Sequence, residues 1–251
     1  MPATPSLPSS CIVVTGASRG IGAATALKLA EAGWTVACLS RSGKLPGDAS
    51  GPTAARLLGV ECDITQPGSM KAALDSVAKR GLEIKGLVNN AGVHLDAPSA
   101  IASLEHYETV MATNATSVLL GCQAAYPHLV ASGGGLIINM GSFFDKLGVK
   151  RNLAYCASKA AVAAMTRCLA VEWAGDGIRV LTLAPGYIHT DLNHEAMTEG
   201  PLRAYLDKRI PGRKPGTADD VAELIATLFS LKGRFFTGEI LYLDGAQGIA
   251  H

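Results

Sequence analysis

The chain has 251 residues, enough for one large domain with a substantial buried core or for two small ones. Hydrophobic residues make up 48% and charged residues 17%, with 28 glycines, a composition typical of globular α/β proteins rather than of disordered or coiled-coil chains. The net charge of +1 and the lack of a Lys/Arg cluster provide no field that would attract nucleic acid or an anionic membrane, so a small-molecule partner is expected.

The cysteines and the N-terminal residues indicate the cellular compartment in which the protein is expected. The six cysteines are scattered through apolar segments, with no CxxC spacing and no clustered histidines, so we expect buried free thiols, a reducing environment and no metal site. Residues 1–10 lack the basic and apolar regions of a signal peptide and are expected to form a flexible tail before a single domain at residues 11–251. No apolar run approaches the roughly 18 residues that span a membrane. We therefore expect a cytoplasmic protein.

The first forty residues have the pattern of a nucleotide-binding βαβ unit. Residues 11–15 are a short β-branched run typical of a buried parallel strand, residues 23–32 have a helical pattern, and residues 34–40 predict a second strand. Glycines in the intervening loop permit a sharp turn, and the free N–H groups at the start of the helix favour a phosphate. The loop residues expected to bind a dinucleotide are Gly16, Ser18, Arg19, Gly20, Ile21 and Gly22.

The end of the second predicted strand distinguishes the two nicotinamide dinucleotides. An acidic residue there bonds the adenosine ribose hydroxyls, whereas an arginine nearby accepts a 2′-phosphate. Here the strand ends in Ser40 and Arg41 without an acid, and Arg19 can reach the same phosphate. NADP(H) is therefore favoured over NAD(H). The alternative is that both arginines are only solvated surface residues.

The rest of the chain continues the alternation of a doubly wound sheet. Residues 43–52 are rich in Gly, Pro and Ser, so the second helix should be short or replaced by a loop. Asp63 is expected either to accept a hydrogen bond from the adenine amino group or, like Thr65, to cap a helix beginning near Pro67. Further strands are expected at residues 59–62, 86–88, 136–140, 178–184 and 240–243, and helices at residues 70–78, 104–131, 154–173 and 217–231.

Three local features add detail to this pattern. The 104–131 helix is expected to kink at Pro127, and it holds Asn114 in its interior, where asparagine competes for backbone hydrogen bonds and so invites a functional explanation. Residues 187–215 are polar and interrupted by proline, long enough for a mobile lid. Thr217 and Asp220 have the spacing of a capping box.

The most informative stretch runs from Gly141 to Lys159. Residues four apart share a helix face, so Tyr155 and Lys159 should place a phenol and an ammonium in one small space. Ser142 follows the 136–140 strand, at the edge where open α/β sheets bind ligands. Together the three side chains outline a proton-transfer site. His94, His189 and His194 lie in loops that should line it, and are expected to be hydrogen-bonding residues rather than catalysts.

These motifs resemble the classical short-chain dehydrogenase/reductase family, and its 3-oxoacyl-carrier-protein reductase-like subgroup most of all. The matching segments are residues 15–22, 89–92, 114, 142, 155–159, 185–186, 190 and, for the subgroup, 237–245. The resemblance implies a single-domain Rossmann fold with a doubly wound seven-stranded parallel sheet, assembled as a homotetramer or homodimer, that acts on a small-molecule carbonyl or alcohol substrate. The implied cofactor-binding residues beyond the glycine loop, Ser40 and Arg41 are Asp63, Ile64, Asn90, Ala91, Gly92, Tyr155, Lys159, Pro185, Gly186, Ile188 and Thr190.

The resemblance also implies a catalytic tetrad of Asn114, Ser142, Tyr155 and Lys159. Hydride arriving at a carbonyl carbon leaves charge on oxygen, so an acid must supply a proton, and Tyr155 is that general acid/base while Ser142 holds the oxygen. Lys159 is expected to bind the nicotinamide ribose, and Asn114 to hold a water that relays protons. Phenolate at neutral pH needs its pKa lowered by about three units, roughly 4 kcal/mol, with Lys159 and the oxidised nicotinamide as the expected source.

The segment between Ser142 and Tyr155 is expected to select the substrate. Phe143 and Phe144 suggest an apolar wall beside the serine. Three basic residues follow and either favour an anionic small substrate or lie in a solvated loop: Lys146, Lys150 and Arg151.

Several functional alternatives stay open. A carrier-protein substrate would require basic residues at the cleft mouth, yet residues 131–135 are uncharged and Asp176 precedes the sixth strand, which weakens that reading. The alternatives are a 3-oxoacyl-carrier-protein reductase of fatty acid synthesis and an NAD-dependent alcohol dehydrogenase. From other classes come a cofactor-sensing regulator, against which the intact tetrad argues, and an assembly scaffold that binds no dinucleotide.

Overall fold

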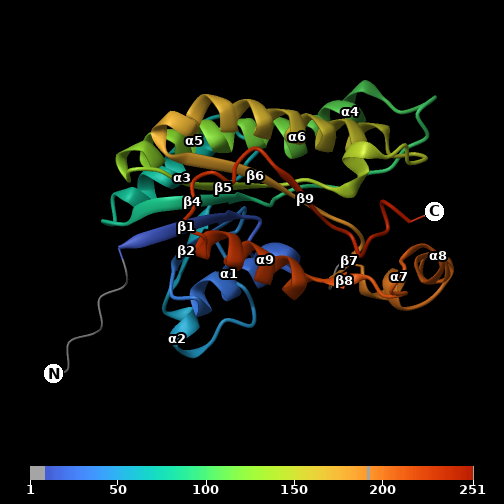
Figure 1. Cartoon of the computed structure of the whole chain (residues 1–251), viewed down its shortest axis with the longest axis horizontal. Coiled ribbons are helices and arrows are strands. Elements are labelled where there is room, and N and C mark those ends of the chain that lie inside the picture. The colour runs from blue at the N-terminus through green and yellow to red at the C-terminus, as the bar shows by residue number, and fades with distance from the viewer. Residues whose placement is uncertain (1–8, 191–192, 251) are drawn as a thin grey trace.

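Seven parallel strands form the central layer of the structure, a computed structural model that describes residues 9–190 and 193–250 (Figure 1). The strands are β1 (Ser10–Thr15), β2 (Thr35–Ser40), β3 (Leu57–Glu61), β4 (Glu83–Asn89), β5 (Gly135–Met140), β6 (Ile178–Pro185) and β9 (Ile240–Leu243). Their order in the sheet is β3-β2-β1-β4-β5-β6-β9, and every neighbouring pair is parallel. The strand order reverses between β1 and β4, the point where doubly wound sheets bind ligands.

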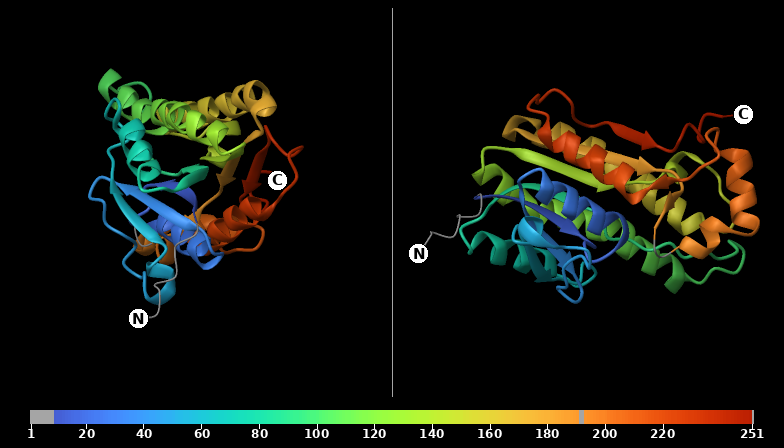
Figure 2. Two further views of the ribbon diagram at one scale, coloured as in Figure 1. Left: turned by 90° about the vertical axis from the view of Figure 1, so that its left-hand side faces the viewer. Right: turned by 90° about the horizontal axis from the view of Figure 1, so that it is seen from below.

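Helices cover both faces of this sheet, as the two further views in Figure 2 also show. One face carries α1 (Gly20–Glu31), α2 (Gly51–Ala54) and α9 (Ala218–Ser230). The other carries α3 (Ser69–Ala78), α4 (Leu104–Met111), α5 (Ser117–Ala131) and α6 (Leu153–Trp173). A separate hydrophobic core lies beneath each helical layer, which explains why the inner strands are apolar on both sides. The predicted doubly wound Rossmann architecture is confirmed.

The predicted 104–131 helix is two α-helices joined by a π-helical segment, Ala112–Thr116. Asn114 lies at the centre of this segment, while α5 continues through Pro127 to Ala131. The expected kink at Pro127 stays a prediction, and the change in backbone hydrogen bonding lies at the asparagine. Single π-helical turns inside α-helices occur frequently at functional sites, where they re-aim a side chain.

The segment expected to be a lid has regular structure. It contains β7 (Ile188–His189), α7 (His194–Thr198) and α8 (Pro201–Arg209), and β7 pairs with β8 (Gly216–Thr217). Leu206 and Ile210 pack with Met197 in a small apolar cluster of their own. Figure 1 shows α7 and α8 at one end of the sheet, near the C-terminus. Whether this unit moves as a lid stays a prediction.

Two further expectations about the chain can be compared with the structure. The predicted tail falls mostly outside the described residues, and Ser10 already belongs to β1. All six thiols are free, but Cys156 is only half-buried and Cys168 is exposed, so the expectation of uniform burial was wrong. Cys168 lies on the outer face of α6, whereas its neighbours Leu169 and Ala170 face the core. Within the described ranges, no helix is both long and apolar enough to cross a membrane.

Candidate active site

The loop between β1 and α1 forms a tight cradle. Gly16 and Gly20 have φ values of +66° and +56°, in the left-handed region that favours glycine. A Cβ on Gly22 would lie 2.2 Å from the carbonyl oxygen of Gly16, so only glycine permits the first turn of α1 to pack against the strand end. Ser18 and Ile21 are half-buried in the same loop, and Ile21 also packs into the core beneath α1. Backbone N–H groups are thereby left at a helix start, as a pyrophosphate requires.

Asn90 fastens this loop to the end of β4. Its Nδ2 donates to the carbonyl oxygen of Thr15 at 2.9 Å. The Thr15 hydroxyl oxygen in turn accepts from the backbone N–H groups of Asn90 at 2.9 Å and Ala91 at 3.0 Å. These bonds connect the loop after β4 to the loop after β1. The strand ends on either side of the topological reversal are therefore joined by hydrogen bonds next to the glycine loop.

The end of β2 has the features expected of an adenosine 2′-phosphate site. Ser40 Oγ is buried and has no hydrogen-bond partner among the described residues. Arg41 and Arg19 are both exposed at this edge of the sheet. A buried unpaired hydroxyl, together with two exposed arginines at the same edge of the sheet, fits a phosphorylated ribose, because an unpaired buried polar group is otherwise costly.

Asp63 stabilises its own turn. Its Oδ1 accepts hydrogen bonds from the backbone N–H and the hydroxyl of Thr65, at 3.0 and 2.7 Å, and these bonds lower the pKa of the carboxyl, with a smaller effect from Arg41. The predicted capping of the next helix was wrong, because α3 begins at Ser69 after Gly68, which has a φ of +80° and no side chain to cap with. Ile64 follows Asp63 and packs against the core.

Ser142, Tyr155 and Lys159 converge at the end of β5. The Ser142 hydroxyl lies close enough to the Tyr155 phenol to lower the pKa of that phenol. Lys159 Nζ lies 5.6 Å from the centroid of the Tyr155 ring and donates to the carbonyl oxygen of Met140 at 2.8 Å. The predicted helix face is confirmed, since both residues lie on α6 and point toward the end of the same strand.

The pKa values of these groups are set mainly by burial. Burial raises the pKa of Tyr155, and the neighbouring Ser142 hydroxyl only partly opposes this increase. Burial lowers the pKa of Lys159 to about 8. The expected depression of the phenol pKa is thus not supplied by the protein alone, because desolvation disfavours the phenolate more strongly than the Ser142 hydroxyl favours it. The phenol is held protonated, which is the form that donates a proton.

Asn114 connects two sides of the site. The fully buried side chain accepts from Val93 N at 2.8 Å through Oδ1 and donates to Val93 O at 2.8 Å through Nδ2. Nδ2 also lies 3.3 Å from the Ser158 hydroxyl, which donates to the carbonyl oxygen of Tyr155 at 2.7 Å. The side chain thereby positions the loop after β4 against the helix that carries the tyrosine. Its expected role in holding a water stays a prediction.

The loop after β6 closes the site on a third side. A Cβ on Gly186 would lie 2.8 Å from Asp244, so the chain passes tightly over the end of β9. Pro185 and Ile188 are buried, and the Thr190 backbone N–H donates to Asn193 Oδ1 at 2.8 Å. A Cβ on Gly20 would lie 3.8 Å from the Thr190 methyl group, which brings this loop to the glycine loop. The loop after β6 therefore lies beside the glycine loop at the carboxyl edge of the sheet.

An aromatic wall surrounds the tyrosine. The Phe144 ring centroid lies 5.9 Å from that of Tyr155, and Tyr187 packs edge-on against Phe143 and Phe144 at 5.6 and 6.1 Å. The predicted apolar wall beside Ser142 is confirmed. The sequence analysis did not predict Tyr187 as a site residue, although its position directly after Pro185-Gly186 could have indicated this role.

His94 is a hydrogen-bonding loop residue, as expected. Its Nε2 is hydrogen-bonded to Asn152 Oδ1, and its ring lies 4.7 Å from the Tyr155 ring. Asn152 is buried and donates from Nδ2 to the carbonyl oxygen of Lys150 at 2.9 Å. Asn152 was also missed, and only its position three residues before Tyr155 could have indicated it.

Two of the three basic residues before Tyr155 interact with other side chains of the protein. Arg151 forms an exposed ion pair with Asp96 at 2.6 Å, and Lys146 Nζ lies 3.6 Å from the centroid of the Tyr242 ring. Lys150 is exposed. These contacts favour the hypothesis that the basic residues belong to a solvated loop over the hypothesis that they bind an anionic substrate.

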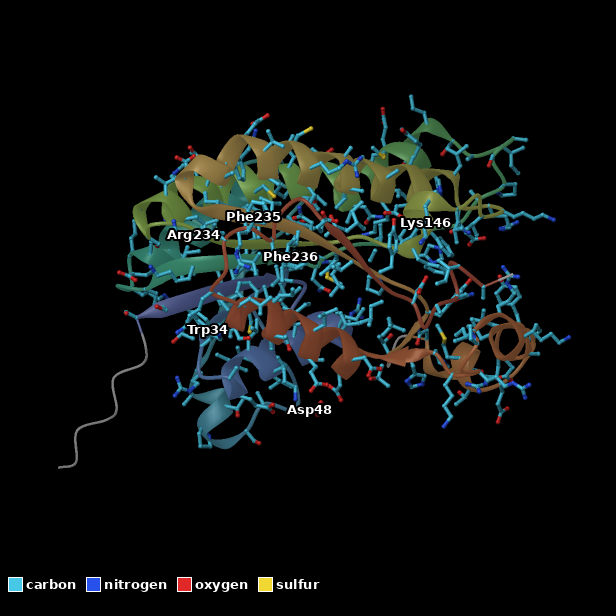
Figure 3. The ribbon with its side chains drawn as sticks, viewed as in Figure 1. Trp34, Asp48, Lys146, Arg234, Phe235 and Phe236 are labelled. Carbon is cyan, nitrogen blue, oxygen red and sulfur yellow. The ribbon has the colours of Figure 1, made fainter. Side chains whose placement is uncertain are left out.

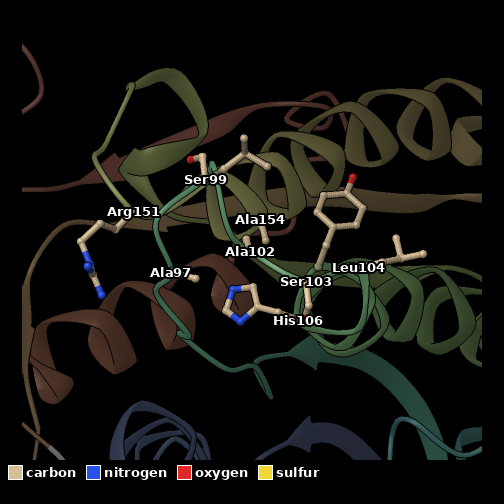
Figure 4. A pocket seen from close by; sticks show the side chains of 10 residues that line it. Ala97, Ser99, Ala102, Ser103, Leu104, His106, Arg151 and Ala154 are labelled. Carbon is tan, nitrogen blue, oxygen red and sulfur yellow. Dashed lines mark hydrogen bonds between the residues drawn. The ribbon is translucent and has the colours of Figure 1, made fainter.

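A cleft opens beside the start of α6, between the 97–104 loop and the segment of Arg151, Leu153 and Ala154 (Figure 4). His106 and Tyr107 of α4 contribute to its wall. None of the four tetrad residues lines this cleft. It is therefore separate from the hydrogen-bonded site around Tyr155.

Comparison with known proteins agrees with this geometry. Residues 16–246 match the family model described as enoyl-(acyl carrier protein) reductase. D-threitol dehydrogenase of Mycolicibacterium smegmatis is 35% identical over 241 residues, covering 94% of this chain and 92% of that protein. The 3-oxoacyl-[acyl-carrier-protein] reductase MabA of Mycobacterium tuberculosis is 32% identical over 252 residues, covering 99% and 97%.

A solved structure gives the same fold. The gluconate 5-dehydrogenase from Burkholderia cenocepacia J2315, in complex with NADP and tartrate, superposes with a TM-score of 0.86 at 29% identity. The superposition covers 96% of each chain.

Proposed function

The chain belongs to the short-chain dehydrogenase/reductase family and is an oxidoreductase of alcohols and ketones, and we propose that it uses NADP(H) with Tyr155 as the general acid/base. The observation that carries the proposal is the convergence of Ser142, Tyr155 and the buried Lys159 at the end of β5, at the same sheet edge as the glycine cradle. When bound, the nicotinamide supplies or accepts the hydride.

The preference for NADP(H) is supported by the end of β2. Ser40 Oγ is buried without a partner among the described residues, Arg41 and Arg19 are exposed nearby, and no carboxylate follows the strand. A guanidinium group binds a phosphate through charge-assisted hydrogen bonds, whereas it has no comparable partner on the ribose hydroxyl of NAD(H). A solved relative is described with NADP bound, which adds support without extending to this chain.

The chain's own residues divide the proton chemistry between them. Ser142 holds the substrate oxygen next to the phenol, and Tyr155 gives that oxygen a proton during reduction or removes one during oxidation. Lys159 keeps N–H groups beyond the one bonded to Met140 O, because an ammonium has three donors, and these are available to the nicotinamide ribose. Asn114 fixes the loop after β4 and is the proposed anchor for a proton-relaying water.

The proposed substrate is small and uncharged, with an apolar group next to the carbonyl. Phe144 and Tyr187 provide flat apolar surface against the tyrosine, and Arg151 and Lys146 are occupied by Asp96 and Tyr242. An activity screen of carbonyls and alcohols, run with NADPH and NADH in parallel, tests the proposal. Reduction of neutral ketones with NADPH is expected, and a complete lack of turnover despite tight NADPH binding would favour a regulator.

A second candidate is 3-oxoacyl-carrier-protein reduction, which the MabA relatives and the family description favour. Asp176, which weighed against this candidate in the sequence, accepts a hydrogen bond from Tyr126 at 2.9 Å at the turn before β6. This turn lies at the opposite edge of the sheet from Tyr155, so it does not bear on a carrier that docks at the cleft mouth. Comparing 3-oxoacyl thioesters on a carrier protein with the same acyl group on a short thiol distinguishes the two. A large preference for the carrier-linked form would establish the second candidate.

Assembly and location complete the proposal. Apolar side chains are exposed on the outer layer formed by α4, α5 and α6, and they are Leu104, Leu120, Leu153 and Val171. A homotetramer or homodimer that covers this layer is the proposed assembly, and light scattering of the purified protein tests it. A cytoplasmic location stays a prediction.

A further inference from the structure

A side chain of the last strand of the sheet contacts the turn that follows Ser142. This turn is the 3₁₀ helix Phe143–Lys146. The Tyr242 hydroxyl of β9 donates to the Asp145 carboxylate, at 3.0 Å from Oδ1 and 3.2 Å from Oδ2. Lys146 Nζ lies over the same tyrosine ring. In Figure 3, Lys146 is labelled beside the C-terminal segment. One aromatic side chain thus contacts two consecutive residues of the turn.

The same 143–146 turn also forms hydrogen bonds with Ser142. The Asp145 backbone N–H donates to the carbonyl oxygen of Ser142 at 2.9 Å. The Phe144 backbone N–H donates to Ser142 Oγ at 3.3 Å. The same hydroxyl lies close enough to the Tyr155 phenol to lower its pKa. Hydrogen bonds from Tyr242 to Asp145, and from the backbone of Asp145 and Phe144 to Ser142, therefore connect β9 to the serine beside the phenol.

The strand end that carries Tyr242 is a firm anchor. In the β6–β9 ladder Tyr242 is opposite Ala184, and Leu243 is opposite Pro185. Asp244 accepts from the backbone N–H groups of Ala246 at 3.0 Å and Gly248 at 2.8 Å, which folds the chain back after the strand. The tyrosine is consequently held by the sheet itself rather than by a loose tail.

We propose that Tyr242 is a positioning residue for catalysis, which acts through Asp145 and the 143–146 turn to hold the Ser142 hydroxyl against Tyr155. The inference rests on the proposed function. A carboxylate that accepts from a phenol fixes a short turn more firmly than backbone bonds alone, since hydrogen bonds to charged groups are the stronger ones. Small misplacements of catalytic groups lower turnover steeply.

Tyr242→Phe is the decisive variant, because it removes only the hydroxyl and keeps the ring beneath Lys146. We expect kcat for ketone reduction to fall about tenfold, with NADPH affinity unchanged. In alcohol oxidation, the pH limb that reports the phenol should move to higher pH, because the Ser142 contact that lowers the Tyr155 pKa is weakened. The other titratable groups against Tyr155, which are Lys159, Cys156 and His94, are unchanged in this variant.

Tyr126→Phe is the matched control. It removes an equivalent bond from a tyrosine to a carboxylate, with Asp176, at the opposite edge of the sheet. Its kcat and pH profile should equal those of the wild type. Asp145→Asn keeps an acceptor oxygen and should retain more turnover than Asp145→Ala.

The possible outcomes distinguish the positioning role of Tyr242 from the proposed oxidoreductase function. Active wild type together with an unchanged kcat and pH profile in Tyr242→Phe would overturn the positioning role alone. Equal losses in Tyr242→Phe and Tyr126→Phe would also overturn it, because the effect would then be general destabilisation. Wild type that turns over no carbonyl or alcohol would overturn the proposed function, and the inference with it.

Discussion

Lys159 Nζ donates to the carbonyl oxygen of Met140 at 2.8 Å, which joins the helix of the tyrosine to the strand that delivers the serine. Met140 is the last residue of β5, so this bond fixes α6 at the point where the chain turns toward Ser142. The ammonium is buried, and burial lowers the pKa of Lys159 to about 8. A buried ammonium in this position lowers the stability of the ligand-free protein, and this effect is measurable.

The stability of the ligand-free protein should depend on the charge of Lys159. The folded pKa of about 8 lies below the reference value of 10.5, so between these values the unfolded chain binds more protons and stability rises with pH. Below this window both states are protonated and the full burial penalty applies. Relative to Lys159→Met, the wild type should gain about 1.5 kcal/mol of unfolding free energy from pH 8 to about pH 9.5.

Chemical denaturation of both proteins at the two pH values measures this change. The buried thiols Cys11 and Cys38, with pKa values raised to about 12, are common to both proteins and cancel in the difference. A difference that stays flat with pH would contradict the lowered pKa of Lys159.

Tyr155→Phe should abolish turnover without affecting cofactor binding. The variant keeps the ring that packs against Phe144 and His94 but loses the only atom that exchanges a proton. We expect kcat to fall by about 10² to 10⁴, the range for loss of a general acid. Steady-state kinetics and NADPH fluorescence titration measure the two quantities. High residual activity would show that the proton comes from another group.

Arg41→Ala should discriminate between the dinucleotides. Losing a charge-assisted bond to the 2′-phosphate removes about 1.5–3 kcal/mol, so NADPH affinity should fall roughly 10- to 100-fold while NADH affinity changes little. Calorimetric titration with both cofactors measures this. Arg80→Ala is the control, since Arg80 is exposed at the turn before β4, at the opposite edge of the sheet. Equal losses for NADPH and NADH would rule out the assignment.

Gly22→Ala should impair dinucleotide binding although alanine favours helices. The added Cβ would lie 2.2 Å from the Gly16 carbonyl oxygen, a backbone atom that cannot move without opening the cradle. Overpacking of this kind costs about 1–3 kcal/mol, which exceeds the helix-propensity gain of about 1 kcal/mol. Thermal melting and NADPH titration check this. Gly47→Ala, where a Cβ meets nothing within 4 Å, should leave both unchanged.

Sequence reasoning located the elements well wherever local chemistry decides structure. The apolar run of β1, the glycines before α1 and the capping box of α9 were all read correctly, since strand burial, left-handed turns and helix caps depend on a few adjacent residues. The π-helical turn at Asn114 was not predicted. That irregularity depends on the Val93 backbone, which lies far away in sequence.

The sequence by itself determined the chemistry of the site, because Ser142, Tyr155 and Lys159 are fixed by a strand end and one helical turn. The tertiary structure decided their electrostatics and surroundings. Three features depend on contacts between segments up to 97 residues apart in the chain. They are the desolvation of Tyr155 and Lys159, the aromatic wall with Tyr187, and the hydrogen bond from Tyr242 to Asp145. Burial and long-range hydrogen bonds are properties of packing, and no local pattern of residues specifies them.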